Sequence, residues 1–353
     1  MESYLAKTDW KERLRQYGIY NVALYGAGKY GRAALENIRR YMPQLRIVCF
    51  LDDNKIRNNA DIDGIEVMSL KEAMEEKEDF HILITNYYVL STLEKIEKNG
   101  FDIDRAFFWG GLLIEDVGPD VLEANRENLK RAFESLSDYQ SKAVFRNMVE
   151  SRYTKNIDLL GRTCQEKQYF PEDIFTLGAE EVFVDGGAFD GDTICQFLEE
   201  TGGKFRRIYA FEPDMENYRK LKENCRDERI VHYNGGLWNE TAELSFSANK
   251  GGSSKVEAEG GNRIQAYKFD DLDSLDENIT FIKMDIEGAE LNALYGMEQT
   301  IKRCKPKLAI CIYHKFEDLW ELPLYIRKLV PEYKLYIRNY TTYLDEIVLY
   351  AVL

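Results

Sequence analysis

Short apolar runs alternate with amphipathic stretches through the first part of the chain. The expected strands are residues 21–25, 45–51, 81–85 and 106–109. Apolar residues at helical spacing predict helices at residues 32–41 and 89–99. Strands that alternate with helices at this spacing are typical of a small doubly wound sheet. We therefore expect a Rossmann-like domain over residues 1–112.

The same alternation resumes at about residue 180. The expected strands of this second sheet are residues 182–184, 208–211, 281–284 and 308–313. Two β-rich runs follow, 333–338 and 347–352, and the turn-like stretch 339–345 between them is long enough only for a hairpin. We expect a second doubly wound domain over residues 176–353, with a parallel sheet that ends in an antiparallel hairpin.

The stretch between the two sheets has a helical pattern. Pro119 suits a helix start, and the apolar residues that follow have the spacing of one helical stripe: Leu122, Leu129, Phe133 and Leu136. We expect a helical segment over residues 113–175 that joins the domains and covers the ligand cleft of the second. The predicted fold class is thus α/β, with two Rossmann-like domains joined by helices.

Composition limits the partners. The 353 residues are enough for two domains with sizeable cores, and no apolar run reaches the ~20 residues that cross a bilayer. The net charge of −15 argues against nucleic acid and anionic membranes as partners. The six cysteines show no Cys-x-x-Cys spacing, which is typical of reduced thiols. With no signal-peptide core at the N-terminus, we expect a cytoplasmic protein.

The strand at residues 182–184 runs into Asp185 and a turn that contains Gly186, Gly187 and Gly191. Glycines at the end of a parallel strand let a ligand approach the backbone, because a Cβ would block it. An acidic residue before the glycines suits a positively charged ligand better than a pyrophosphate. The turn therefore predicts binding of S-adenosylmethionine, whose sulfur carries a positive charge.

Three further polar residues, Glu212, Asp285 and His314, follow apolar runs in order along the chain. Ligands of open parallel sheets bind at the carboxyl ends of the strands, so we expect these residues to share one site with Asp185. Glu212 comes 27 residues after Asp185, about one strand–helix–strand unit, which suits a carboxylate that binds both ribose hydroxyls. Pro213 is expected to begin the next helix.

Residues 236–238 follow a further expected strand around His232, and we expect them to border the adenine. The expected cofactor-binding residues are Asp185, Gly186, Gly187, Ala188, Gly191, Glu212, Pro213, Leu237, Trp238 and Asp285.

These segments resemble the FkbM-type S-adenosylmethionine-dependent methyltransferases. The resemblance covers about residues 145–353 and rests on five motifs: Tyr169-Phe170-Pro171, Val184-Asp185-Gly186-Gly187-Ala188, Phe211-Glu212-Pro213, the Asp-x-Glu-Gly-x-Glu element that begins at Asp285, and Ile312-Tyr313-His314-Lys315. It implies a methyltransferase sheet and O-methylation of sugars, polysaccharides or related natural products. Many relatives have Asn where this chain has Phe189, so the methionine pocket is expected to differ in shape.

A hydroxyl acceptor must lose its proton during methyl transfer, and Asp285 or His314 is the expected general base. Alternatively, Asp285, Glu287 and Glu290 form the acidic first turn of a helix. The alternative role of Glu212 is to cap the helix that follows it. The three acids are also a candidate set for Mg²⁺, because hard cations favour carboxylates. We favour a site without metal.

The first domain contains Gly26, Gly28 and Gly31 as a Gly-x-Gly-x-x-Gly turn between strand and helix, with Asp52 and Asp53 after the next strand. The segment resembles nucleotide-sugar-binding domains attached to polysaccharide-modifying enzymes, which implies a nucleotide-sugar ligand. There are two alternatives: the domain is a scaffold that binds no ligand, or the turn binds NAD.

These expectations describe an S-adenosylmethionine-dependent O-methyltransferase that acts on a sugar or glycan-precursor hydroxyl. The alternative is a nucleotide or nucleotide-sugar sensor with an inert second domain. The set of acids at the strand ends speaks against an inert domain, since buried carboxylates are costly to keep without a role.

Overall fold

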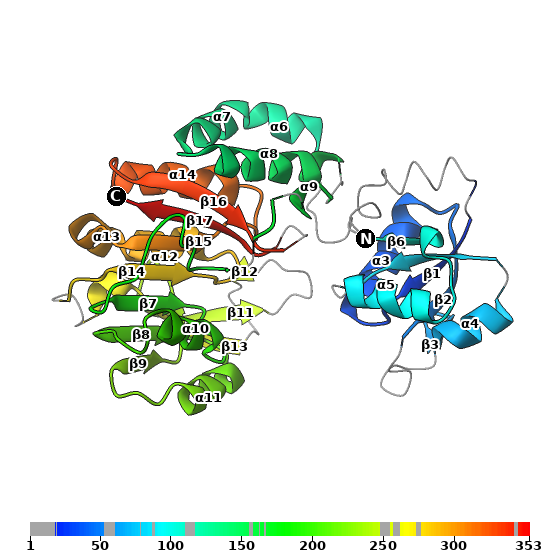
Figure 1. The fold of residues 1–353 in the computed structure, drawn as a ribbon, viewed down its shortest axis with the longest axis horizontal. Helices are drawn as coiled ribbons and strands as arrows, with labels where there is room; N and C mark the ends of the chain where they lie inside the picture. Colours follow the sequence, from blue (N-terminus) through cyan, green and yellow to red (C-terminus); the bar gives the residue numbers. More distant parts are fainter. Residues whose placement is uncertain are drawn as a thin grey trace. The chain divides into compact units, whose positions relative to one another are not determined.

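The computed structural model describes residues 18, 20–52, 61–77, 79–86, 89–109, 117–154, 158–161, 163–165, 167–247, 255–256, 262–272, 277–341 and 345–353. The chain divides into two compact units (Figure 1). The first comprises residues 1–116 with 150–158, and the second comprises residues 117–149 with 159–353.

The first unit contains one mixed sheet, in the order β3-β4-β2-β1-β5-β6 within the described residues. Its strands are β1 (Asn21–Tyr25), β2 (Arg46–Leu51), β3 (Asp61–Ile62), β4 (Ile65–Met68), β5 (His81–Ile84) and β6 (Ala106–Phe108). Its helices are α3 (Lys29–Tyr41), α4 (Leu70–Glu76) and α5 (Val89–Lys98). Strand β1 pairs in parallel with β2 and β5, which confirms the predicted doubly wound arrangement.

A hairpin at the edge of this sheet escaped the sequence analysis. Strands β3 and β4 are antiparallel, and Asp63 and Gly64 between them both have positive φ, 53° and 79°. An Asp-Gly pair favours this two-residue turn because both positions tolerate left-handed backbone. The signal was present in the sequence, but the strands that flank it are too short to show alternation.

The second unit contains a seven-stranded sheet in the order β16-β17-β15-β14-β7-β8-β9. The strands are β7 (Val182–Gly186), β8 (Arg207–Phe211), β9 (Ile230–Tyr233), β14 (Phe281–Met284), β15 (Lys307–Cys311), β16 (Lys334–Asn339) and β17 (Ile347–Val352). Neighbours from β9 to β15 pair in parallel, whereas β17 is antiparallel to both β15 and β16. The predicted parallel sheet with an antiparallel hairpin is confirmed, and its last strand, β17, lies inside the sheet.

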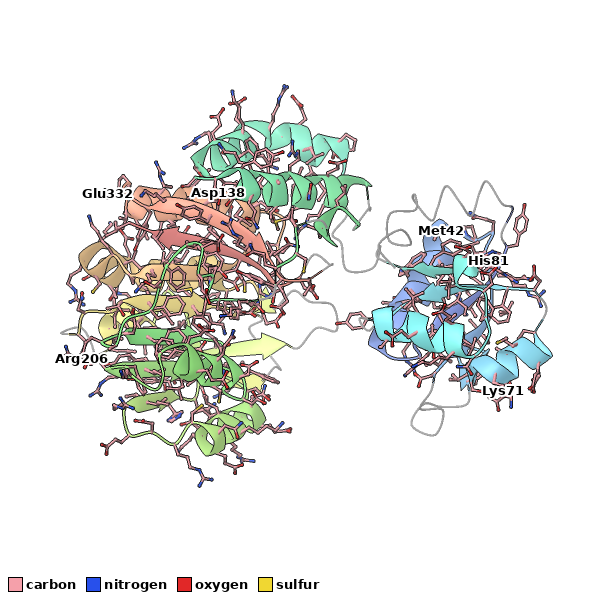
Figure 2. The ribbon with its side chains drawn as sticks, in the orientation of Figure 1. Met42, Lys71, His81, Asp138, Arg206 and Glu332 are labelled. Carbon is pink, nitrogen blue, oxygen red and sulfur yellow. The ribbon has the colours of Figure 1, made fainter. Side chains whose placement is uncertain are left out.

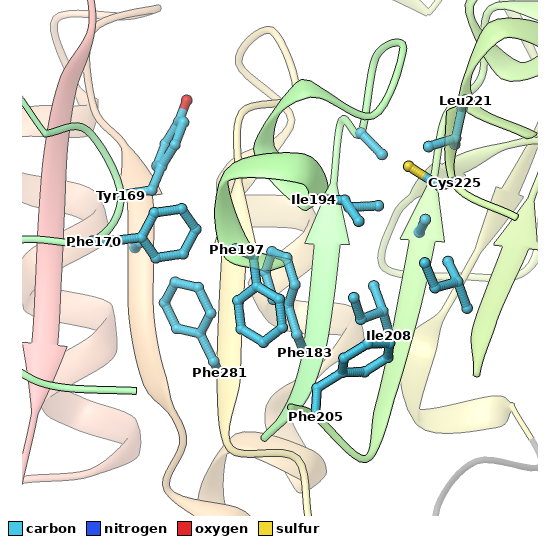
Figure 3. Packing of buried hydrophobic residues seen from close by; sticks show 14 of the residues in the cluster. Tyr169, Phe170, Phe183, Ile194, Phe197, Phe205, Ile208, Leu221, Cys225 and Phe281 are labelled. Atoms are coloured by element: carbon cyan, nitrogen blue, oxygen red, sulfur yellow. The ribbon is translucent and has the colours of Figure 1, made fainter. Parts of the chain in front are cut away.

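Aromatic rings fill the core on one face of β7 and β14 (Figure 3). Phe183 stacks on Phe197 of helix α10 (Asp192–Glu200) and on Phe281, with ring centroids 4.8 and 4.9 Å apart. All three side chains are inaccessible to solvent. Burial of a side chain of this size contributes about 1.5–3 kcal/mol, so this cluster stabilises the strands that present the site.

A small second sheet follows β9 in the chain and was not predicted. Strand β11 (Ala242–Ser247) pairs antiparallel with β13 (Asn262–Tyr267), and β10 (Gly236–Leu237) runs parallel to β13. Apolar and polar residues alternate along β11, as expected for a half-buried strand.

The helical segment consists of α6 (Pro119–Ala124), α7 (Arg126–Ser135), α8 (Tyr139–Thr154) and α9 (Asp158–Gly161). Helix α7 packs on α14 (Asp318–Leu329), beside the outer strand β16 (Figure 1). Ser137 N–H donates to the carbonyl of Leu335 (2.8 Å), and Gln165 N–H donates to the carbonyl of Asn339 (2.9 Å). The segment thus pairs with the exposed edge of the sheet, which otherwise invites association with other strands.

Arg338 fastens this segment to β16. Its guanidinium lies 2.7 Å from carboxylate oxygens of both Asp138 (labelled in Figure 2) and Asp173. Arg338 is 2% exposed, and Ser141 Oγ accepts a further hydrogen bond from it (3.0 Å).

No helix in the described part of the chain is long and apolar enough to cross a membrane.

Candidate functional site

The turn after β7 is shaped by the packing of the chain itself. Gly187 has φ +76°, and a Cβ there would lie 1.9 Å from the Asp285 carbonyl oxygen. At Gly186 a Cβ would lie 2.9 Å from the buried side chain of Leu237. Gly191 has φ +94° and is the N-cap of α10. The N–H groups of Gly187 and Ala188 both donate to the Phe211 carbonyl (3.0 Å). These close contacts hold three strand ends together.

Asp185 lies at the end of β7 and forms an ion pair with Lys283, whose Nζ is 3.0 Å from Asp185 Oδ1. Both side chains are buried. Lys283 Nζ also donates to the carbonyls of Gly187 (2.7 Å) and Gly186 (3.3 Å). Lys283 therefore neutralises the strand-end acid and fixes the glycine turn.

Burial dominates the ionisation of this pair. It raises the pKa of Asp185, and the attraction of Lys283 opposes that shift. Burial alone would lower the pKa of Lys283, but the attraction of Asp185 outweighs it and the pKa of Lys283 is raised. The lysine therefore stays protonated beside the turn. Lys283 was not among the predicted residues, although a lysine inside the apolar run at 281–284 was a visible signal.

Glu212 ends β8 and is 6% exposed. Its two carboxylate oxygens accept the backbone N–H groups of Phe189 (2.9 Å) and Asp214 (2.8 Å). A carboxylate offers about four acceptor positions, so about two are left for other donors. Burial raises the pKa of Glu212, and the two backbone hydrogen bonds oppose that shift.

The cap of the next helix is a different residue. Helix α11 (Met215–Asn224) has Asp214 as its N-cap, whose side chain accepts the N–H groups of Glu216 and Asn217 (2.9 Å each). The alternative that Glu212 caps this helix is therefore wrong. The expectation that Pro213 begins the helix is also wrong, because the capping acid lies between Pro213 and the first helical residue.

Asp285 follows β14 and is held by two tyrosines. Tyr169 donates to Asp285 Oδ2 (2.9 Å), and Tyr313 donates to Asp285 Oδ1 (3.0 Å). Figure 3 shows the Tyr169 hydroxyl pointing away from the aromatic cluster, in the direction of the strands' carboxyl ends. Neither of these tyrosine–carboxylate hydrogen bonds was predicted from the sequence.

His314 follows β15, as predicted, and lies among carboxylates. Its Nδ1 is 3.2 Å from Glu290 Oε1, and its Nε2 is 3.4 Å from Asp285 Oδ1 and 3.7 Å from Glu287 Oε2. Burial would lower the pKa of His314, but Glu290 and the other acids outweigh it and raise the pKa to about 9. In the absence of another cation, His314 is therefore an imidazolium at neutral pH.

The two acids that follow Asp285 differ in their surroundings. Glu290 is fully buried at the first position of α12 (Glu290–Gly296), and its Oε1 accepts the Ile286 N–H (2.9 Å). Glu290 therefore lies in the first turn of a helix, as the alternative for these three acids predicted. The side chain of Glu287 is 79% exposed, at φ +56°. Only Glu290 is available as an interior ligand.

Residues 236–238 lie where the small sheet begins. Leu237 is buried against the glycine turn. The N–H of Trp238 donates to the Tyr267 carbonyl (2.8 Å), and the Trp238 carbonyl packs on α12 at Gly296. A Cβ on Gly236 would meet no atom within 4 Å, so space is open beside it.

Strained backbone gathers around these strand ends. Among the described residues, six non-glycine residues have positive φ, and four of them contact the site or its immediate neighbours: Tyr169, Phe189, Glu287 and Glu346. Tyr169 and Phe189 contact Asp285 and Glu212 as described above, and Gln168 donates to Glu346. Residues in this conformation cost about 1–3 kcal/mol each and cluster at functional sites.

The glycine turn of the first unit is also well defined. Gly26 has φ +123°, and a Cβ on Gly31 would lie 1.8 Å from the Gly26 carbonyl oxygen. Asp52 Oδ2 accepts the Ala27 N–H (3.1 Å). Gly28 is exposed, with open space where a Cβ would be. Asp53, the other predicted acid, lies outside the described residues.

One cluster in the described part of the chain has the composition of a metal site. Asp285, Glu290 and His314 each offer one ligand atom, and these atoms lie within 4.8 Å of one another. The set differs from the carboxylate trio considered for Mg²⁺, because His314 takes the place of Glu287.

The second unit contains a match to a known protein family. Residues 185–340 match the sequence profile of the methyltransferase FkbM domain. The crystal structure of methyltransferase FkbM from Methylobacillus flagellatus KT is similar in fold, with 24% identity, 98% of this chain and 93% of that chain covered, and a TM-score of 0.74. No protein with a curated description matches the chain.

Two other solved structures are similar over about half of the chain. Fibrillarin from Aeropyrum pernix, solved with natively bound S-adenosyl-L-methionine, has 13% identity, covers 51% of this chain and 70% of its own, and has a TM-score of 0.32. The precorrin-6y C5,15-methyltransferase from Geobacter metallireducens GS-15 has 9% identity and a TM-score of 0.32, and the match covers 50% of this chain and 81% of that chain.

Proposed function

We propose that the chain is an S-adenosylmethionine-dependent methyltransferase that methylates a hydroxyl oxygen of a sugar or glycan precursor, because residues 185–340 match the methyltransferase FkbM domain. The observation that carries this proposal is the Asp285 carboxylate. It is held by two tyrosine hydroxyls at the same sheet edge as Glu212. A carboxylate fixed in this way suits removal of a proton from an alcohol.

Glu212 and its neighbours fit the cofactor. The two free acceptor positions of the Glu212 carboxylate match the two hydroxyls of a ribose, and the open space beside Gly236 suits the adenine. Asp185 is neutralised by Lys283, so we assign it to fixing the turn that receives the methionine part. The cofactor, when bound, supplies a methyl group on a positively charged sulfur.

Asp285 is the general base in this proposal. It would accept the hydroxyl proton as the new oxygen–methyl bond forms, while the sulfur–methyl bond breaks and leaves a neutral thioether. His314 is the weaker candidate, because its raised pKa of about 9 keeps it protonated at neutral pH. Tyr169 and Tyr313 hold the carboxylate in place for the transfer.

The charge around Asp285 supports a neutral acceptor. Glu287, Glu290 and Glu346 lie in the same region, and the chain carries a net charge of −15. An acceptor with a phosphate close to its reactive hydroxyl would be repelled there. A sugar presents hydroxyls without charge, in agreement with the family resemblance.

The test is a mass-shift screen of sugars and glycan precursors with S-adenosylmethionine, followed by location of the new methyl group. We expect a gain of one methyl on oxygen with the wild type and a loss of transfer in Asp285→Asn. Binding of S-adenosylhomocysteine should be unchanged in that variant. A product methylated on nitrogen or carbon would show the assignment to be wrong.

For the first unit we propose a nucleotide or nucleotide-sugar ligand at the Gly26–Gly31 turn. Support comes from the exposed Gly28 and from Asp52, which fixes the turn through the Ala27 N–H. A nucleotide-sugar should raise the melting temperature of the wild type by binding the folded state. The shift should be lost in Gly28→Val, whereas S-adenosylhomocysteine should still stabilise that variant.

A further inference from the structure

The geometry points to a divalent transition-metal site formed by Asp285, Glu290 and His314. Two carboxylates and one imidazole converge from the end of β14, the start of α12 and the end of β15, with one ligand atom of each within 4.8 Å of the others. Three protein ligands leave coordination positions open, as in catalytic metal sites.

The second observation is a set of buried polar atoms without hydrogen bonds. The side chain of His314 is 6% exposed, and its ring nitrogens lie 3.2 Å from Glu290 Oε1 and 3.4 Å from Asp285 Oδ1 without the angles of a hydrogen bond. Glu290 is fully buried, and its Oε2 also has no hydrogen bond there. Buried polar atoms are nearly always satisfied, and exceptions of this kind call for an ion or another partner.

The ligand types select the class of metal. Mg²⁺ prefers oxygen ligands only, whereas an imidazole with two carboxylates suits first-row ions such as Mn²⁺, Fe²⁺ and Zn²⁺. Two carboxylates also balance the charge of a divalent ion. The site therefore differs from the carboxylate trio in both its ligands and its preferred metal.

The site lies at the proposed general base, and its catalytic consequence rests on the proposed function. An ion there would bind the acceptor hydroxyl at an open position and lower the pKa of that hydroxyl. Asp285 would contact the ion through Oδ1, which faces His314, and its Oδ2, which accepts from Tyr169, would remain the oxygen that takes the hydroxyl proton. The metal site itself does not depend on which acceptor is methylated.

The test is a titration of full-length, chelator-treated protein with Mn²⁺, in which electron paramagnetic resonance counts the free ion. Mn²⁺ is the probe because the exposed thiols of Cys164 and Cys195 would bind Zn²⁺ adventitiously. We expect one saturable site in the wild type, at least tenfold weaker binding in His314→Ala and Glu290→Gln, and poor competition by Mg²⁺. His232→Ala is the matched histidine control and should bind as the wild type does.

Retained binding of S-adenosylhomocysteine shows that each variant is folded. The proposal is overturned if the wild type has no saturable Mn²⁺ site, or if His314→Ala binds Mn²⁺ as the wild type does. It is also overturned if Glu287→Gln abolishes binding while His314→Ala does not, since that result assigns the ion to the carboxylate trio. Mn²⁺ binding without methyl transfer would contradict the proposed function but leave the metal site standing.

Discussion

Lys283 and Asp185 form a buried ion pair across neighbouring strands, with 3.0 Å between Nζ and Oδ1. The two residues are register partners in the β7–β14 pairing. Removal of one partner leaves an uncompensated charge in the core, so we expect Lys283→Met to lower the free energy of unfolding by about 3–5 kcal/mol.

Urea denaturation of the single and double variants measures this pair. Asp185→Asn combined with Lys283→Met should recover part of the loss, because no unpaired charge is left. Lys220→Met, which removes an exposed pair with Glu216, should change stability little. Equal losses in the single and double Lys283 variants would contradict the interpretation.

Glu212 is predicted to bind the ribose. Glu212→Ala removes a charged acceptor of hydrogen bonds, and such bonds contribute about 1.5–3 kcal/mol each. We therefore expect S-adenosylhomocysteine to bind at least tenfold more weakly in calorimetry. Glu216→Gln, an exposed substitution on the following helix, is the control. Unchanged affinity in Glu212→Ala would show that the ribose lies elsewhere.

Tyr169 and Tyr313 are predicted to position the Asp285 carboxylate. Tyr169→Phe and Tyr313→Phe should each lower kcat about tenfold and leave KM for the acceptor nearly unchanged, since they act through the proposed base. Asp285→Asn should cost about 10²–10⁴ in kcat. Tyr325→Phe removes a remote tyrosine–carboxylate hydrogen bond, to Glu298, and should leave kcat as it is. A rise in KM alone would assign the two tyrosines to acceptor binding.

Asp318 gives a pH-dependent stability. Burial raises its pKa to about 7, with Glu290 adding to the shift and the Lys315 N–H opposing it. The folded state therefore holds this proton more tightly than the unfolded chain. The resulting stability is fully present below about pH 4, where the group is protonated in both states, and is lost as pH rises through 7.

Asp318→Asn should remove this loss, because the amide does not ionise. The difference between the free energies of unfolding of the variant and the wild type should increase in favour of the variant from pH 4 to pH 7, by up to about 4 kcal/mol. The difference should be constant above pH 8. Urea denaturation with chelator present measures both proteins, and parallel pH curves would contradict the prediction.

Alanine substitutions at Gly187 and Gly203 distinguish the cost of a steric clash from the cost of backbone strain. Both have positive φ, +76° and +71°, but a Cβ on Gly187 would meet the Asp285 carbonyl at 1.9 Å, whereas one on Gly203 meets nothing within 4 Å. Gly203→Ala should cost only about 1–2 kcal/mol. Gly187→Ala should cost more and weaken binding of S-adenosylhomocysteine. Equal losses of stability would mean that the turn can shift.

The strands and the strand-end acids could be predicted because they depend on local patterns. Apolar runs, glycine turns and the polar residues that follow them predicted that four residues lie at the carboxyl ends of the strands: Asp185, Glu212, Asp285 and His314. The pairing of Lys283 with Asp185 could not be predicted in the same way. It depends on β14 lying next to β7, two strands separated by about a hundred residues.

Other parts of the site depend on long-range packing in the same way. Tyr169 reaches Asp285 only because the segment after the helices returns to the sheet edge. Strands β11 and β13 of the small sheet pair across a connection of residues 248–261, which is too long to predict a hairpin from sequence. The surroundings of His314 also depend on packing, because the acids that raise its pKa lie on the stretch from the end of β14 to the first residue of α12, which meets the end of β15.

The position of β17 has a consequence for biosynthesis. It follows β16 in sequence, yet it lies between β15 and β16 in the sheet and is almost entirely buried. Until residues 347–352 leave the ribosome, the backbone edge of β15 has no neighbour on that side. The nascent chain therefore has an unpaired apolar strand edge until β17 has been made, and such edges favour association with other chains.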